Sequence, residues 1–109
     1  MGLRQNPMFK HALQPYRHGR FTLAGRALTK HPNVVGVQDT AELVRQFEHQ
    51  NGVNKAAAEA LKNMMRHGTR ITKHTKAFGD VVEFRLPNGL GARFHALTNT
   101  FIGFLGRGI

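Results

Sequence analysis

Apolar residues recur every three or four positions through much of the first two thirds of the chain, the spacing of helices that pack on a core. A short helix is expected after Thr22, whose hydroxyl can accept a hydrogen bond from the first turn. That helix must end before Pro32. A longer helix is expected over residues 55–66, begun by Asn54 and followed by Gly68.

A further helix is expected between these two. The segment Asp39-Thr-Ala-Glu42 is a variant of the capping box, in which the first carboxylate accepts an early amide proton and the second reaches back. It predicts a helix over about residues 40–50, ended by Asn51-Gly52.

The period of the pattern changes to two after Gly68, which is the period of a half-buried strand. Three or four antiparallel strands are expected, over residues 70–76, 80–86, 91–96 and 100–105. Their short spacing indicates a meander. The predicted fold class is α+β, with N-terminal helices packed on one face of a C-terminal antiparallel β-sheet and the other face open.

The first twenty residues show neither period. They contain Pro7 and Pro15 and are rich in basic and imidazole side chains. We expect residues 1–20 to form a basic extended lead-in and residues 21–109 to form a single domain, because the chain length allows one core of ordinary size.

Strand pairing decides which side chains share the open face. With Val82 and Phe84 turned toward the helices, Phe94 of the next strand must turn inward as well. This alignment pairs Phe84 with Phe94 and leaves a three-residue loop at residues 88–90, a common hairpin with a glycine bulge.

The same alignment sets Glu83 opposite His95, and Arg85 opposite Arg93, on the open face. Two arginines directly opposite each other are unfavourable in a simple sheet. Their juxtaposition is favourable if an anion lies between them. In the alternative interpretation both arginines extend into water and Glu83 makes an ordinary surface ion pair.

The charge of the chain indicates its partner. Sixteen Lys and Arg residues against six Asp and Glu residues give a net charge of +10, so the expected partner is a polyanion, RNA or DNA. Six carboxylates are few for a nuclease that clusters them around divalent metal, which also counts against a DNase. The chain has no cysteine, which excludes disulfides and thiolate zinc sites. No apolar run approaches a membrane span, and the N-terminus lacks the apolar core of a signal peptide.

Seven histidines favour acid–base chemistry without a metal cofactor. Cleavage of RNA by its own 2'-hydroxyl needs a base, an acid, and groups that stabilise charge on the phosphate. Glu83, His95, Arg85 and Arg93 could fill these roles. His74 is the alternative base or acid, in a segment whose other candidates for binding substrate are Arg70, Thr72, Lys73 and Lys76. A single histidine is more often a bystander, so the prediction concerns the cluster; His11, His18 and His49 are expected to be dispensable.

Three stretches carry a resemblance to a known family: GRALTKHPNVVG, NKAAAEALKNMMRHGTR and FGDVVEFRLPNGLGARFHALTNTFIGFLGR. Together, over about residues 20–107, they resemble the C-terminal toxin domains of bacterial polymorphic toxins of the contact-dependent inhibition and Rhs types. The most specific parts are GARF at residues 91–94 and TFIGFL at residues 100–105. Such domains are similar in plan to the barnase, EndoU, colicin and RelE group of ribonucleases.

The resemblance implies a metal-independent endoribonuclease, often a tRNase, that needs no cofactor. It implies delivery to a neighbouring cell at the tip of a secreted or surface-exposed effector, action in the target-cell cytoplasm, and inhibition by an acidic cognate immunity protein in an otherwise monomeric state. Glu83 with His95 is similar to the pairing in barnase, and His74 with Lys76 and Thr100 is similar to EndoU-like combinations.

The alternative function is a non-catalytic basic RNA-binding module. Such a module is expected to present aromatic side chains on which bases stack. The eight phenylalanines fall mostly on expected core positions, and Tyr16 is the one tyrosine, so stacking surfaces are scarce. A ribonuclease is therefore the favoured interpretation.

Overall fold

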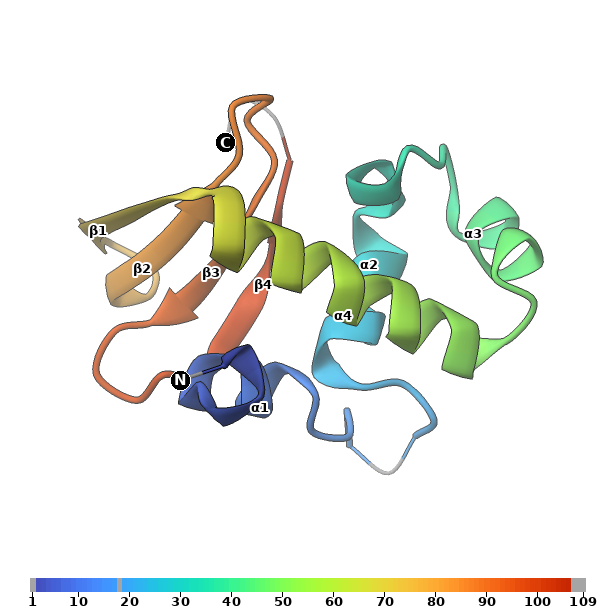
Figure 1. Ribbon diagram of the computed structural model, residues 1–109, viewed down its shortest axis with the longest axis horizontal. Coiled ribbons are helices and arrows are strands. Elements are labelled where there is room, and N and C mark those ends of the chain that lie inside the picture. The colour runs from blue at the N-terminus through green and yellow to red at the C-terminus, as the bar shows by residue number, and fades with distance from the viewer. Residues whose placement is uncertain (1, 18, 107–109) are drawn as a thin grey trace.

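The computed structural model describes residues 2–17 and 19–106. Helices precede the strands along the chain, as Figure 1 shows. The helices are η1 (Leu3–Gln5), α1 (Pro7–Ala12), α2 (Leu23–Lys30), η2 (Pro32–Val35), α3 (Thr40–Gln46) and α4 (Gln50–His67). The strands are β1 (Thr69–Thr75), β2 (Gly79–Arg85), β3 (Gly91–His95) and β4 (Phe101–Leu105).

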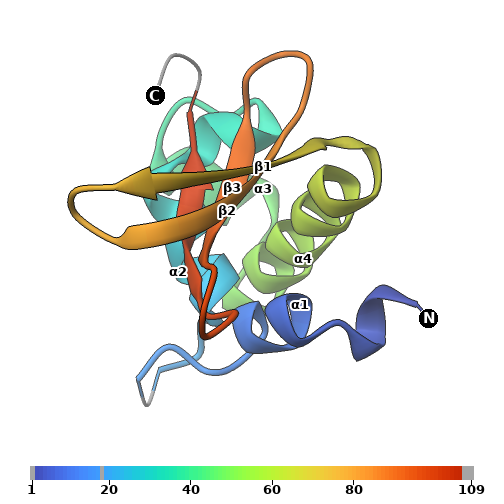
Figure 2. The ribbon, with the colours of Figure 1, turned by 90° about the vertical axis from the view of Figure 1, so that its left-hand side faces the viewer.

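The strands form one antiparallel sheet in the order β1-β2-β3-β4, so each strand pairs with its neighbour along the chain. Helix α2 packs against β4, and α4 packs against β3 and β2. Figure 2 shows the sheet in front of α2 and α3, with its other face uncovered. The predicted α+β class, with helices on one face of a meander, is confirmed; the uncovered face is called the open face below.

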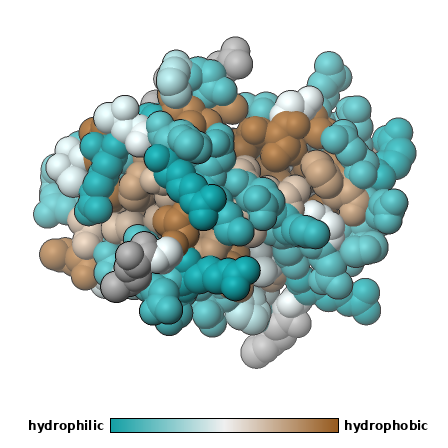
Figure 3. Space-filling view, viewed as in Figure 1, coloured by the Kyte–Doolittle hydropathy of each residue, from teal (hydrophilic) through white to brown (hydrophobic). Residues whose placement is uncertain are grey.

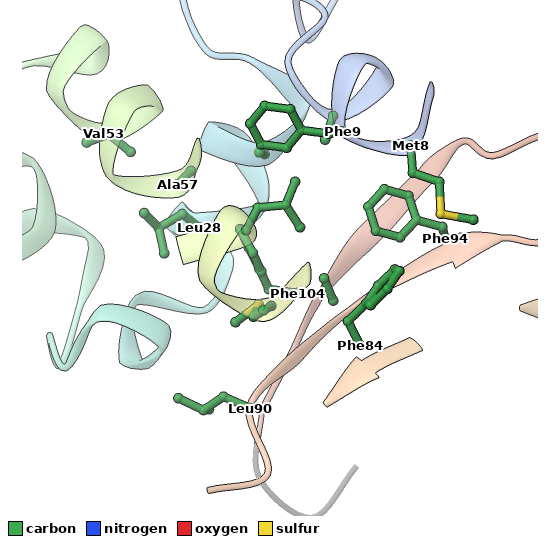
Figure 4. Packing of buried hydrophobic residues seen from close by; sticks show 14 of the residues in the cluster. Met8, Phe9, Leu28, Val53, Ala57, Phe84, Leu90, Phe94 and Phe104 are labelled. Atoms are coloured by element: carbon green, nitrogen blue, oxygen red, sulfur yellow. The ribbon is translucent and has the colours of Figure 1, made fainter. Parts of the chain in front are cut away.

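The core lies between the helices and the sheet. Val82, Phe84 and Phe94 point into it, as the alternation of the strands predicts. Phe84, Phe94, Phe101 and Phe104 form a row of edge-to-face contacts, with ring centroids 6.0, 5.4 and 5.5 Å apart. Figure 4 shows Phe84 and Phe94 facing the helices. Each buried ring contributes roughly 1.5–3 kcal/mol of transfer free energy, so this row anchors the sheet.

The N-terminal segment differs from the expectation. An extended conformation for residues 1–20 is wrong over α1, which begins with Pro7 and is capped by Asn6, whose side chain accepts hydrogen bonds from two amides of the first turn. Met8 and Phe9 are buried in the core. The helix is too short to show a period, and proline at its first position favours a helix start. The division into a lead-in and a domain stays a prediction.

The boundary between α3 and α4 also differs from the expected position at Asn51-Gly52. The break comes earlier, where Glu48 adopts a left-handed φ of 73°. The side chain of His49 then caps α4 by accepting a hydrogen bond from Gly52 N–H (3.2 Å). Gly52 lies inside α4. Glycine is required at this position because a Cβ would overlap the carbonyl oxygen of Phe47. This glycine therefore permits a close approach and does not end a helix.

Asn54 lies inside α4 and does not cap it, contrary to the expectation. Its side-chain oxygen accepts a hydrogen bond from Thr22 N–H (2.9 Å), and its amide donates to the carbonyl of Arg20 (2.7 Å). Thr22 in turn caps α2 through Gly25 N–H (2.9 Å), as predicted. A polar link therefore fixes α4 to the start of α2.

Replacing Asn54 with alanine should lower the free energy of unfolding by about 1–3 kcal/mol, because Thr22 N–H and the Arg20 carbonyl lose their partner. Asn63→Ala is the matched control, since Asn63 is exposed on the same helix and its replacement should change stability by at most about 0.5 kcal/mol. Urea unfolding of both variants measures the difference. Equal effects would show that the link between α2 and α4 contributes nothing.

Candidate active site on the open sheet face

The register of β2 and β3 differs by two residues from the expected one. The expected pairs Phe84–Phe94, Glu83–His95 and Arg85–Arg93 are wrong. The observed pairs are Val81–His95, Val82–Phe94, Glu83–Arg93, Phe84–Ala92 and Arg85–Gly91. A shift of two residues keeps every side chain on its expected face, because side chains alternate with a period of two. The open face therefore carries the expected residues in different partnerships.

The loop of this hairpin explains the shift. Leu86 N–H donates to the carbonyl of Leu90 (2.8 Å), so the loop consists of Pro87, Asn88 and Gly89. Leu90 is buried and therefore belongs to the packed part of the hairpin. Gly89 has a φ of 92°, which favours glycine at the bulge position.

Glu83 lies at the centre of a cluster of three cations on the open face. Its Oε1 accepts a hydrogen bond from Arg85 Nε (3.1 Å), and its Oε2 accepts two from Arg93, at 2.8 and 2.7 Å. Lys73 Nζ of β1 lies 3.3 Å from Oε2. The Glu83 side chain is 2% exposed. The anion between the two arginines is therefore Glu83 itself, and the alternative of an ordinary surface pair is wrong.

Burial alone would raise the pKa of the Glu83 carboxyl, since it penalises the charged form. The hydrogen bonds from Arg93 and Arg85 outweigh that penalty and hold the pKa below its ordinary value. Glu83 is therefore an ionised carboxylate that fixes the positions of the surrounding cations.

The three cations differ in their hydrogen bonds to the rest of the protein and in their exposure to solvent. Arg85 also donates to the carbonyls of Gly89 (2.7 Å) and Gly106 (3.2 Å), which fixes it to the β2–β3 loop and the end of β4. Arg93 contacts Glu83 through Nε and one terminal nitrogen, and Lys73 is 45% exposed. Lys73 is thus the most exposed of the three cations, whereas the side chains of Arg93 and Arg85 are 13% and 14% exposed and Arg85 is held by two backbone carbonyls as well.

His95 lies at the edge of this cluster, beside an aromatic ring. The ring of Phe78, from the turn between β1 and β2, is edge-to-face with His95 at 5.9 Å and 5.8 Å from the Arg93 guanidinium. Phe78 is 42% exposed. Phe78 is not among the residues predicted from the sequence, although a large apolar residue in a polar hairpin turn is a signal that could have found it.

Thr100 and His95 are connected by a backbone hydrogen bond. Its carbonyl accepts a hydrogen bond from His95 N–H (2.8 Å), across the loop between β3 and β4. Its hydroxyl is 2.8 Å from that of Thr98. Thr100 therefore borders the same end of the open face.

The even-numbered residues of β1, among them His74, lie on the face opposite to that of Lys73. Thr72 pairs with Val82 and His74 pairs with Asp80, so Thr72 and His74 share a face, as predicted, but on the helix side of the sheet. The expectation that His74 joins His95 on the open face is wrong, because Val82 fixes the even-numbered residues of β1 to the opposite side. His74 Nδ1 lies 2.8 Å from Asp80 Oδ1, and both side chains are exposed.

The remaining predicted residues lie on or next to β1. Arg70 is on the helix side, where its guanidinium lies 6.0 Å from the ring of Phe84, and Lys76 follows β1 in the turn. A hollow of about 380 Å³ lies beside His74 and is lined by Thr72, Lys73, His74, Asp80, Val81 and Ala96. Two groups of candidate residues therefore exist, one on each side of the β1–β2 hairpin.

A larger hollow, of about 540 Å³, lies away from both groups. It separates η2 from α4 and has mostly apolar walls, which include Val34, Phe47 and Leu86. Figure 3 shows brown side chains gathered beside α4 in this region. An apolar hollow does not stabilise a phosphate, so the polar open face is the candidate active site.

Within residues 2–17 and 19–106, no three His, Asp or Glu side chains gather closely enough to hold a metal ion. In the same ranges no helix is both long and apolar enough to cross a membrane. His18 lies outside the described residues.

A sheet with helices on one face, and with an imidazole, cations and an ionised carboxylate on the other, defines an α+β domain suited to binding and cleaving RNA. The family model of the CdiA C-terminal tRNase toxin domain matches residues 9–106. The chain therefore belongs to this family and is an antibacterial tRNase toxin domain, as the resemblance in its sequence implies.

A solved structure supports the assignment. The fold is similar to the toxic C-terminal tip of CdiA from Pseudomonas aeruginosa, which was crystallised in complex with an immune protein. The two chains share 29% sequence identity with a TM-score of 0.66, over 89% of this chain and 99% of that chain. No curated protein sequence matches this chain significantly.

Replacing Glu83 with glutamine should lower the free energy of unfolding at neutral pH by about 3–5 kcal/mol, because two largely buried arginines lose their counter-charge. Glu59→Gln is the matched control: Glu59 is 64% exposed and pairs with Lys62, so its loss should cost at most about 0.5 kcal/mol. Denaturant unfolding at pH 7 measures both effects.

The contribution of Glu83 to the free energy of unfolding should also depend on pH. Its pKa is lower in the folded than in the unfolded chain, so its stabilisation is present above the unfolded value, about 4.3, and is lost as the pH falls through the folded value. The stability difference between the wild type and Glu83→Gln should therefore shrink below about pH 4. A difference that stays constant to pH 2 would contradict the ionised state of Glu83.

Proposed function

We propose that this tRNase cleaves its substrate at the open sheet face, by attack of a ribose 2'-hydroxyl on the adjacent phosphorus. The bond from O2' to phosphorus forms and the bond from phosphorus to O5' breaks, which gives a 2',3'-cyclic phosphate and a 5'-hydroxyl. The observation that carries the proposal is the ionised carboxylate of Glu83, held between Arg93 and Lys73 on the face that also carries His95.

The cations supply the site for the phosphate. Arg93 uses Nε and one terminal nitrogen on Glu83, which leaves donors on its other terminal nitrogen among the five of a guanidinium. Lys73 adds a second charge from the neighbouring strand. Together they stabilise the negative charge that grows on the phosphate oxygens in the transition state.

Glu83 and His95 supply the proton transfers. A phosphate that draws Arg93 and Lys73 toward itself weakens the hydrogen bonds that lower the pKa of Glu83, while burial continues to raise it. Substrate binding therefore makes this carboxylate a stronger base for the 2'-hydroxyl proton. His95 gives a proton to the leaving 5'-oxygen, the reaction for which imidazole is suited at neutral pH.

Phe78 and Thr100 complete the site. The exposed part of the Phe78 ring can stack against a base next to the cleaved bond, since stacking accepts any base. Thr100 orients the strand end that carries His95 through its carbonyl. The rival candidate is His74 on the helix side, where it shares a hollow with Thr72 and Asp80.

The proposal extends to immunity and delivery, which the family supports. The neighbouring structure is a CdiA tip held by an immune protein, which supports a cognate immunity protein for this chain as well. That partner is acidic, because the net charge of +10 favours rapid capture by a surface of opposite charge. The domain is carried at the C-terminus of a secreted or surface-exposed effector and acts on tRNA in the target-cell cytoplasm.

Incubation of the purified protein with total tRNA in excess EDTA should yield fragments that end in a 2',3'-cyclic phosphate, with 5'-hydroxyl ends on the matching fragments. The end groups can be identified by mass spectrometry and by labelling with polynucleotide kinase. Loss of cleavage in EDTA, or fragments with 5'-phosphate ends, would show a metal-dependent mechanism instead. No cleavage of any RNA would favour the non-catalytic RNA-binding alternative.

His95→Ala should leave a folded protein whose rate of tRNA cleavage falls by about 10²- to 10⁴-fold, because a proton donor is lost. His49→Ala is the control: His49 caps α4 far from the sheet, so its replacement should cost stability but not activity. Cleavage rates and thermal unfolding are measured together. Full activity in His95→Ala with loss in His74→Ala would move the reaction to the helix side of the β1–β2 hairpin.

A further inference from the structure

A groove of about 270 Å³ separates α2 from the edge strand β4. Figure 2 shows these two elements side by side. The groove is distinct from the Glu83 cluster, which lies on β1, β2 and β3. Its polar walls come from the segment before α2, from that helix and from its C-cap: Tyr16, Arg26, Lys30 and His31.

The groove is positively charged. Arg26 and Lys30 line it, and none of its lining residues is acidic. The hydrogen bond from Arg26 and the positive charge of Arg17 lower the pKa of the Tyr16 hydroxyl. Such an environment favours a bound anion.

Tyr16 offers an aromatic surface in the same place. The guanidinium carbons of Arg17 and Arg26 lie 5.2 and 5.4 Å from the centre of its ring. Tyr16 N–H donates to the carbonyl of Phe21 (2.8 Å), which holds the backbone in position beside the groove. An aromatic ring among guanidinium groups is the combination that binds single-stranded RNA, through stacking and phosphate contacts.

Gly103 connects this groove to the candidate active site. It pairs with Arg93 across β3 and β4, and it also lines the groove. A Cβ added to Gly103 would meet no atom within 4 Å, so packing does not require glycine there. Glycine within a strand lowers stability, and it often marks a place where a ligand approaches the backbone closely.

We propose that the groove between α2 and β4 is a second RNA subsite, entered by a tRNA strand that crosses the bare backbone of Gly103 from the phosphate at Arg93. In this subsite Arg26 and Lys30 bind a phosphate and Tyr16 stacks on a base. The inference rests on the proposed function, because it takes the open face as the place of cleavage.

The first test blocks the passage. Gly103→Val adds a side chain that β-strands favour and that meets open space, so the protein should fold with unchanged or higher stability. Its kcat/KM for tRNA should fall roughly 10- to 100-fold, the range of one lost stacking and phosphate contact. Its kcat/KM for dinucleoside monophosphates, which contain one phosphodiester bond and do not reach the groove, should not change.

The second test removes the groove's own contacts. Tyr16→Ala and Lys30→Gln should show the same selective loss on tRNA, with Lys55→Gln, an exposed lysine of α4, as the matched control. Binding of labelled tRNA can be measured in the His95→Ala background, in which cleavage is slow. There Lys30→Gln should also make the negative slope of the logarithm of the association constant against log salt shallower by roughly 0.7–0.9.

Several outcomes would overturn the proposal. One is unchanged tRNA cleavage in all three groove variants. Another is an equal loss on tRNA and on dinucleoside monophosphates, which would show that these residues act on Arg93 or on the fold. A third is normal tRNA cleavage with weakened binding of the immunity protein, which would assign the groove to that protein.

Failure of the proposed function gives a different result. If His95→Ala cleaves tRNA normally while the groove variants still lose tRNA cleavage selectively, the cleavage mechanism is wrong and the groove keeps its role as an RNA subsite.

Discussion

The candidate active site depends on one buried carboxylate. Glu83 lies on the face of the sheet that the helices leave open, yet its side chain is almost fully enclosed by arginine and lysine side chains. Without this anion, Arg85 and Arg93 would be two like charges held close together at high cost. With it, the two guanidinium groups are held side by side on the open face by hydrogen bonds to one carboxylate.

The pairing of the strands places this interaction and also separates the two histidine centres. Because the sheet is a simple meander, each strand presents one set of alternate residues to either side. Val82 points into the core, and it commits its partner Thr72 and the neighbouring His74 to the helix side. Lys73 and His95 are left on the opposite side. The two histidines that the sequence singles out therefore lie on opposite faces of the sheet.

Much of this arrangement could be predicted from the sequence, because hydrophobic alternation fixes the faces of the residues in β2 and β3. It does not fix the register, since loops at residues 88–90 and at 87–89 give the same faces. The observed register buries Leu90 and replaces the like-charge pair Arg85–Arg93 with Glu83–Arg93. The short helix α1 shows no period, and Gly52 has the same signature as a helix end. Phe78 stands out in the sequence as a large apolar residue in a polar turn, but its contacts with His95 and Arg93 join that turn to another strand and could not be predicted from the sequence.

The position of the Glu83 cluster along the chain has a consequence for the order in which the site is synthesised. Every side chain of the Glu83 cluster comes from the last third of the domain, and Arg85 also bonds to the carbonyl of Gly106 near its end. Synthesis proceeds from the N-terminus, and helices α1 to α4 emerge first. Under the proposed function, the domain therefore lacks Glu83 and the cations that would bind the phosphate until β2 and β3 have been synthesised.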